Sequence, residues 1–212
     1  MNGRRFRPLR HGSPALPWRT LLLAGLALAL YLLAGPAPGA LVYDRAAIVQ
    51  GEWWRLLSGH WVHADGSHAG WDILGLLCLG LLFEPKLGRL LPLALLAGTA
   101  AVDLWLLTGS GLARYCGLSG ILNALLAAGL AAWWRELRSP VIPLVAAGAL
   151  AKIVVEIGAG EALFTRTLWP STPIAHGAGF AAGALLVLIR LWWWKTATGA
   201  QTPRAGYRAG PR

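Results

Sequence analysis

The chain has 212 residues, of which 56% are hydrophobic and 13% are charged. A soluble domain of this length would carry about twice as much charge, so the composition excludes an ordinary soluble protein and predicts one helical membrane bundle. The net charge of +10 is also typical of nucleic-acid binding, but the basic residues flank apolar segments and fill both tails instead of sharing one folded face. We therefore expect the lipid bilayer as a partner and no nucleic acid.

The first apolar segment follows a basic tail, residues 1–17, which we expect to be cytoplasmic. It predicts a spanning helix over about 18–34 that ends before the breakers Pro36 and Pro38. A basic start, an apolar middle and small residues also fit a cleavable signal peptide. Residues 36–65 then form a long mixed segment whose tryptophans are typical of the membrane–water interface.

Five further apolar segments predict spanning helices at about 67–83, 90–107, 118–134, 141–157 and 173–194. Each approaches the roughly 20 residues that are needed to cross about 30 Å of hydrocarbon. The predicted fold is therefore all-α, a polytopic bundle of six transmembrane helices over residues 18–195. Residues 196–212 are basic and rich in glycine and proline, and we expect this tail to be disordered.

The distribution of basic residues predicts the topology. Fourteen of the 19 lysines and arginines lie in the two terminal regions and in the turns at 84–89 and 135–140, whereas the other three loops hold four. Because basic residues concentrate on the cytoplasmic side, both termini should be cytoplasmic and the number of spans should be even. Cleavage of the first segment as a signal peptide would leave five spans and break this agreement.

Polar groups inside the spans are candidates for function, because a central charge costs about 2.5–3.5 kcal/mol. In the predicted topology, the second, fourth and sixth spans all begin on the extracytoplasmic side. His68, Asp72, Ser119 and His176 therefore lie at a similar depth near that surface. A serine and a histidine at matched depth can form the nucleophile and base of acyl transfer.

Glycines surround both of these residues. A Gly-Leu-Ser-Gly sequence opens the fourth span, where close approach to the backbone and free helix N–H groups would favour developing negative charge. Glycines also lie one and two turns after His176. Such small residues would let the sixth span touch a neighbouring helix and bring His176 within reach of Ser119. Each motif by itself also fits plain helix packing. The glycines concerned are Gly117, Gly120, Gly179 and Gly183.

Other polar residues in the spans have simpler interpretations. His68 and Asp72 share a helix face and could bind a metal, with His60 and His63 close by. However, there is no HExxH sequence, neither cysteine belongs to a metal-binding spacing, and the serine motif would stay unexplained. We therefore expect no metal and no cofactor. Asp103 and Asn123 are expected to make hydrogen bonds between helices.

Taken together, the motifs resemble the rhomboid family of intramembrane serine proteases over roughly residues 50–190. The family's Trp-Arg pair in the first loop is matched by Trp54 and Arg55. Its histidine-x4-histidine-x3-asparagine cluster is matched by His63 and His68, with Asp72 in place of the asparagine. The GxSG sequence at 117–120 and the AHxxGxxxG sequence at 175–183 complete the pattern.

The resemblance implies a role for each matched residue. Ser119 would attack the scissile carbonyl and His176 would take its proton, with no acidic third member because the family uses a dyad. His68 and the Ser119 backbone N–H would stabilise the oxyanion, and His63 would hold the first loop. Asp72 departs from the pattern, because an ionised aspartate cannot donate a hydrogen bond. It would either be protonated by burial or orient His68.

Within the family, the compact size and the Lys152–Glu156 pair of the fifth span resemble rhombosortases. These small bacterial rhomboids are proposed to process membrane-anchored proteins that carry a C-terminal Gly-Gly signal, a membrane helix and a basic tail. That resemblance implies the bacterial inner membrane and an extracytoplasmic active site. From the residues alone, Lys152 and Glu156 form an i, i+4 ion pair that lowers the cost of burying either charge.

Two other functions compete with proteolysis. A catalytically inactive relative that binds or escorts membrane proteins would usually lack the serine or the histidine, and both are present. A small transporter would often show internal repeats, and none is visible in the sequence.

Overall fold

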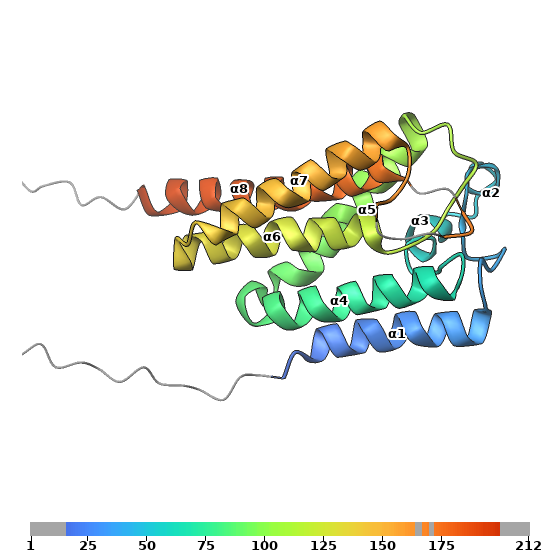
Figure 1. Ribbon diagram of the computed structural model, residues 1–212, viewed down its shortest axis with the longest axis horizontal. Helices are drawn as coiled ribbons and strands as arrows, with labels where there is room; N and C mark the ends of the chain where they lie inside the picture. The colour runs from blue at the N-terminus through green and yellow to red at the C-terminus, as the bar shows by residue number, and fades with distance from the viewer. Residues whose placement is uncertain (1–15, 164–166, 170–171, 200–212) are drawn as a thin grey trace, which may run out of the picture.

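The computed structural model describes residues 16–163, 167–169 and 172–199. Within these residues six long helices lie side by side (Figure 1), each close to a predicted segment. They are α1 (Trp18–Ala34), α4 (Gly66–Leu87), α5 (Leu90–Thr108), α6 (Ser119–Leu137), α7 (Val141–Ala159) and α8 (Pro173–Gly199). α8 thus continues into the tail that was predicted to be disordered, since no proline interrupts it before Pro203. The rest of both predicted tails lies outside the described residues.

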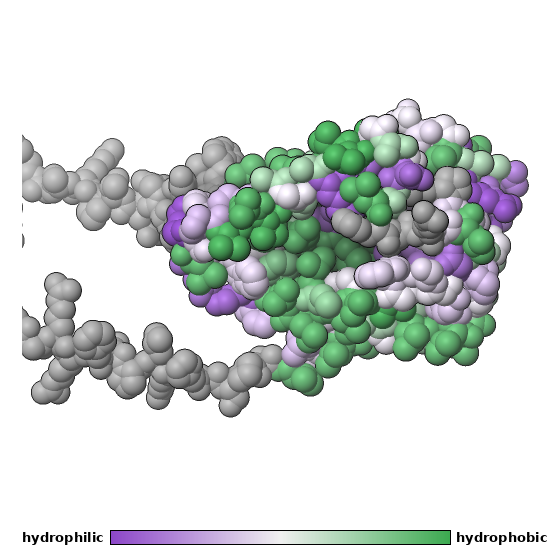
Figure 2. All heavy atoms as spheres, in the orientation of Figure 1, coloured by the Kyte–Doolittle hydropathy of each residue, from purple (hydrophilic) through white to green (hydrophobic). Residues whose placement is uncertain are grey.

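Four of these helices, α4, α5, α7 and α8, are long and apolar enough to cross a membrane, and α1 is a shorter apolar helix of 17 residues. α6 is as long as α5 but less apolar. α6 packs against α4, α5, α7 and α8, so protein surrounds much of it. Figure 2 shows apolar residues over much of the side of the bundle and hydrophilic residues towards its ends. The protein is a multi-pass membrane protein.

The helix ends have identifiable causes. Asp65 is the N-cap of α4 and accepts a backbone hydrogen bond from the first turn. At its other end α4 continues through Pro85 and stops at Gly88, whose positive φ of 52° lies in a region that favours glycine. The predicted turn at 84–89 is therefore partly helical. Glu84, which is buried there, accepts hydrogen bonds from the N–H and hydroxyl of Thr20 and attaches α1 to α4.

α6 and α8 make the closest contact between helices. A Cβ atom added at Gly179 would lie 1.9 Å from the Gly120 carbonyl oxygen, and one added at Gly183 would lie 2.1 Å from the Ala124 carbonyl oxygen. The two backbones therefore touch directly, which only glycine permits. This contact holds the first turn of α8 against the first turn of α6.

The segment between α1 and α4 covers the end of the bundle where α4, α6 and α8 begin (Figure 1). It contains β1 (Tyr43–Asp44), α2 (Arg45–Val49) and α3 (Arg55–Ser58). β1 pairs antiparallel with β2 (Arg114–Tyr115), so Tyr43 lies opposite Tyr115. This short pair of strands was not part of the all-α prediction, and it joins the first loop to the segment that leads into α6.

The Trp-Arg pair stabilises this loop. The buried Arg55 guanidinium donates to the carbonyl oxygens of Gly39 and Val42, at 2.6 and 2.9 Å, and also pairs with Glu52. The indole N–H of Trp54 donates to the carbonyl oxygen of Ala40 at 3.1 Å. Both side chains therefore hold backbone carbonyls of the loop rather than reaching into the site.

Candidate active site

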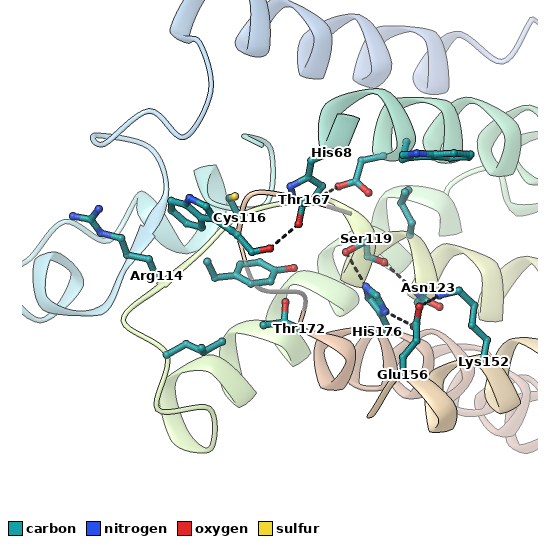
Figure 3. Close-up of a pocket in the computed structure, with 17 residues that line it drawn as sticks. His68, Arg114, Cys116, Ser119, Asn123, Lys152, Glu156, Thr167, Thr172 and His176 are labelled. Atoms are coloured by element: carbon teal, nitrogen blue, oxygen red, sulfur yellow. Dashed lines mark hydrogen bonds and ion pairs between the residues drawn. The ribbon is translucent and has the colours of Figure 1, made fainter. Parts of the chain in front are cut away.

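Ser119 and His176 meet at the loop-covered end of the bundle. Ser119 is the first residue of α6 and His176 lies in the first turn of α8. The Nε2 atom of His176 is 3.0 Å from the Oγ atom of Ser119 (Figure 3), a normal hydrogen-bond distance. The glycine contact between α6 and α8 fixes this separation, because it sets how closely the two first turns approach.

A third side chain contacts the other ring nitrogen of His176. Oε2 of Glu156, on α7, lies 3.1 Å from Nδ1 of His176, and the glutamate side chain is 0% exposed. Its other oxygen, Oε1, accepts from the Lys152 ammonium at 2.6 Å and from the Leu163 backbone N–H at 3.0 Å. From the sequence, no acidic member was expected behind the histidine, and the structure places a buried carboxylate in contact with its ring.

The Asp72 carboxylate contacts the residue before Ser119 and acts as an acceptor. Its Oδ2 atom accepts the backbone N–H of Leu118 at 2.7 Å, in the turn that immediately precedes Ser119. The same oxygen is 3.3 Å from Nε2 of both His63 and His68. Asp72 therefore anchors the turn that presents the serine by accepting this hydrogen bond.

His68 has its proton placed by its neighbours. Its Nδ1 atom accepts the backbone N–H of Ala64 at 3.4 Å, so the proton must be on Nε2, the nitrogen that faces Asp72. The rings of His63 and His68 pack edge to face, with centroids 5.2 Å apart. His68 thus directs its N–H at Asp72, while His63 is fully buried against the His68 ring.

Gly117 and Gly120 leave room for these groups. Gly117 has a φ of +118°, and a Cβ atom there would lie 2.4 Å from Nε2 of His68. At Gly120 a Cβ atom would lie 2.9 Å from Cγ2 of Val102. Both glycines are therefore required by space, and Gly117 also by backbone conformation.

A cavity of about 340 Å³ opens beside the serine. Polar groups line one part of it and apolar side chains the rest, so it offers space for water and a peptide segment within the bundle. The polar lining includes His68, Asp72, Arg114, Ser119, Asn123, Lys152, Glu156, Thr167, Thr172 and His176.

Cys116 also lines this cavity but is not a nucleophile at neutral pH. Burial, together with the negative charges of Asp72 and Asp65, raises the pKa of its thiol to about 12. A protonated thiol is a weak nucleophile, so the chemistry of the cavity falls to Ser119.

Asp103 and Asn123 differ from the expectation of bonds between helices. Asp103 lies 3.0 Å from Nε2 of His60, which belongs to the loop, and so attaches that loop to α5. The Asn123 amide donates to the Ser119 carbonyl oxygen within α6. In the part of the chain that the structure describes, no group of three or more His, Cys, Asp or Glu side chains could hold a metal ion.

The contact between Glu156 and His176 was missed at the sequence level, although a signal was present. α7 starts after the short turn that follows α6, so Glu156, near its far end, lies at the same end of the bundle as Ser119 and His176. The depth comparison that paired the serine with the histidine would have included this glutamate.

Fold and site together define a multi-pass membrane protein with a serine–histidine pair at one end of its helices. The family model described as the Rhomboid domain matches residues 50–193, so the chain belongs to the rhomboid family. Members of this family are typically intramembrane serine proteases. The match includes the serine, the histidine and the Trp-Arg pair. No curated protein matches the chain in a sequence comparison.

Proposed function

We propose that the protein is an intramembrane serine endopeptidase in which Ser119 is the nucleophile and His176 the general base. The observation that carries this proposal is the 3.0 Å contact between Nε2 of His176 and Oγ of Ser119 beside a cavity of about 340 Å³. Membership of the rhomboid family supports the same reaction.

In the proposed reaction, Oγ of Ser119 attacks the scissile carbonyl carbon while Nε2 of His176 takes the hydroxyl proton. His176 then donates that proton to the leaving amine nitrogen, the C–N bond breaks, and an acyl-enzyme forms. A water molecule attacks the ester carbonyl and gives a proton to His176. That proton returns to Oγ as the ester bond breaks, which releases the new carboxyl end.

The oxyanion of each tetrahedral intermediate would accept hydrogen bonds from the backbone N–H of Ser119 and from Nε2–H of His68, which faces Asp72 in the resting site and would turn from it towards the oxyanion. The first four N–H groups of a helix have no partner within it, and Ser119 begins α6. Loss of one such donor commonly costs about 10²–10³ in rate. Asp72 supports this arrangement indirectly, through the Leu118 N–H that it accepts.

For topology we propose six spans in a bacterial inner membrane, with both termini cytoplasmic and the site near the extracytoplasmic face. The concentration of basic residues in the terminal regions and in the two short turns supports this orientation. The start of α1 and the end of α8 lie at the same end of the bundle (Figure 1), as an even number of crossings requires.

The proposed substrates are membrane-anchored proteins whose helices unwind easily where they meet the site. Glycine weakens a helix by about 1 kcal/mol relative to alanine, so a Gly-Gly sequence next to an apolar helix would be readily unwound. The resemblance to rhombosortases supports substrates with a C-terminal Gly-Gly signal, an apolar helix and a basic tail.

Purified protein and a Gly-Gly-tailed membrane substrate test the proposal. Wild-type protein should cleave the substrate and react with a fluorophosphonate probe, while Ser119→Ala should do neither. A substrate with Gly-Gly replaced by Val-Val tests the Gly-Gly preference separately from the protease assignment. Its equal cleavage would remove the Gly-Gly preference, whereas equal cleavage by wild type and Ser119→Ala would overturn the protease assignment.

A further inference from the structure

We propose that Glu156 is the positioning residue of His176, so that the site works as a Ser119–His176–Glu156 triad whose carboxylate is fixed by Lys152. This inference rests on the proposed protease function. Figure 3 shows the four side chains in sequence, from Ser119 on α6 through His176 on α8 to Glu156 and Lys152 on α7.

The first step concerns the proton on the histidine ring. A carboxylate only accepts hydrogen bonds, so the 3.1 Å contact with Oε2 of Glu156 requires the proton of neutral His176 to be on Nδ1. Nε2 then carries a lone pair directed at Oγ of Ser119, 3.0 Å away. That tautomer is the one that can accept the serine proton.

The second step concerns the carboxylate itself. Glu156 is 0% exposed, and a buried carboxylate needs compensating donors. The Lys152 ammonium and the Leu163 N–H both donate to Oε1, which holds the carboxylate plane and leaves Oε2 facing His176. When His176 takes the serine proton it becomes a cation, and the adjacent negative charge stabilises it.

The third step predicts how a glutamine would sit at position 156. Lys152 and Leu163 both donate to the Oε1 position, so the amide oxygen must take that place. The amide NH₂ group then faces Nδ1 of His176 and donates to it. His176 would be left with its proton on Nε2, which would donate to Ser119 and could not accept the serine proton.

Glu156→Gln should therefore be more damaging than Glu156→Ala, although glutamine has nearly the same shape as glutamate. A wrong-tautomer amide at this position of a serine-protease triad lowers kcat by about 10⁴-fold, and we expect a loss approaching that size with little change in KM. Alanine lets His176 adopt either tautomer and should cost less. A purely structural role predicts the reverse order, because alanine leaves a cavity.

The matched control is Glu84→Gln. Glu84 is also a buried glutamate that accepts side-chain and backbone hydrogen bonds, but it joins α1 to α4 three turns beyond Asp72. This variant should lower thermal stability and leave kcat per folded molecule unchanged. Glu156→Asp, which keeps a carboxylate, should be more active than Glu156→Gln.

The tautomer of His176 can also be measured by NMR in a protein that keeps Glu156. This test remains valid if the Glu156 variants do not fold. In Ser119→Ala labelled with ¹⁵N-histidine, the His176 resonances are those lost when His176→Ala is added. They should show a proton on Nδ1, and a neutral ring protonated on Nε2 would overturn the inference.

The kinetic outcomes test the triad and the protease assignment separately. If wild type cleaves substrate, Ser119→Ala does not, and glutamine at 156 is worse than alanine, the triad is supported. If Ser119 is required but Glu156→Gln is as active as wild type or milder than alanine, the triad fails and the protease assignment stands. Equal activity in Ser119→Ala and wild type overturns the protease assignment itself.

Discussion

Gly179→Ala is the most direct test of how the fold builds the site. A Cβ atom at this position would lie 1.9 Å from the carbonyl oxygen of Gly120, whereas ordinary contacts begin at 3.4 Å. The obstacle is backbone on the facing helix, so no side-chain rotation relieves it. α6 and α8 would have to separate by about 1.5 Å, and overpacking of this kind costs about 1–3 kcal/mol.

The same separation acts on the catalytic pair, because His176 lies one turn before Gly179 on α8. Its Nε2 atom is 3.0 Å from Oγ of Ser119, so a shift of about 1.5 Å would break the hydrogen bond. Misplacement by about 1 Å can cost about 10² in rate. We therefore expect kcat to fall at least about 100-fold while most of the protein remains folded.

Gly177→Ala on the same helix is the matched control. Its Cβ atom would meet Cγ2 of Ile153 at 3.5 Å, an ordinary contact. Alanine also gains about 1 kcal/mol of helix propensity over glycine, so this variant should be neutral or more stable and fully active. The assay is substrate cleavage per folded molecule together with thermal unfolding in detergent. Wild-type kcat and stability in Gly179→Ala would refute the idea that this backbone contact positions His176.

Three further predictions concern the loop end of the bundle. Asp72→Asn should retain most of the cleavage rate, because an amide oxygen can accept the same backbone N–H. Asp72→Ala should lose most of that rate, because it leaves the buried N–H of Leu118 unsatisfied at a cost of about 1–3 kcal/mol. Equal rates in the two variants would contradict the anchoring role. In a Cys78→Ser background, Cys116 should react with iodoacetamide far more slowly at pH 7.5 than an unperturbed thiol. The reason is that burial raises the pKa of the Cys116 thiol to about 12. Rapid labelling of the folded protein would contradict the burial of this thiol. Burial alone would raise the pKa of Asp65, but the backbone N–H groups that it accepts outweigh burial and hold that pKa below its ordinary value of 3.8. A lowered folded-state pKa stabilises the protein above the unfolded value, so Asp65→Ala should lower stability by about 1 kcal/mol at pH 7, and the difference should shrink as the pH falls below about 4. A deficit that did not depend on pH would show that the carboxylate charge is not involved.

Much of this architecture could be predicted because its signals are local. Runs of apolar residues interrupted by charged turns gave helices close to those observed, since the length of a span depends on the bilayer and not on neighbouring helices. The motif spacing and the matched depth of Ser119 and His176 followed from the same segments. The family match over residues 50–193 agrees with what the motifs indicated.

What required the tertiary structure was the choice of partner for each buried polar group. Sequence alone shows that Glu156 and Lys152 are one turn apart, but only the packing of α7 against α8 shows that the carboxylate also reaches His176. Likewise Asp72 matched a family asparagine in position, and the structure gave its actual contact, the Leu118 N–H. Hydropathy and spacing fix the depth of a residue along its helix. The rotation of each helix about its axis, which decides what its side chains touch, depends on contacts between helices.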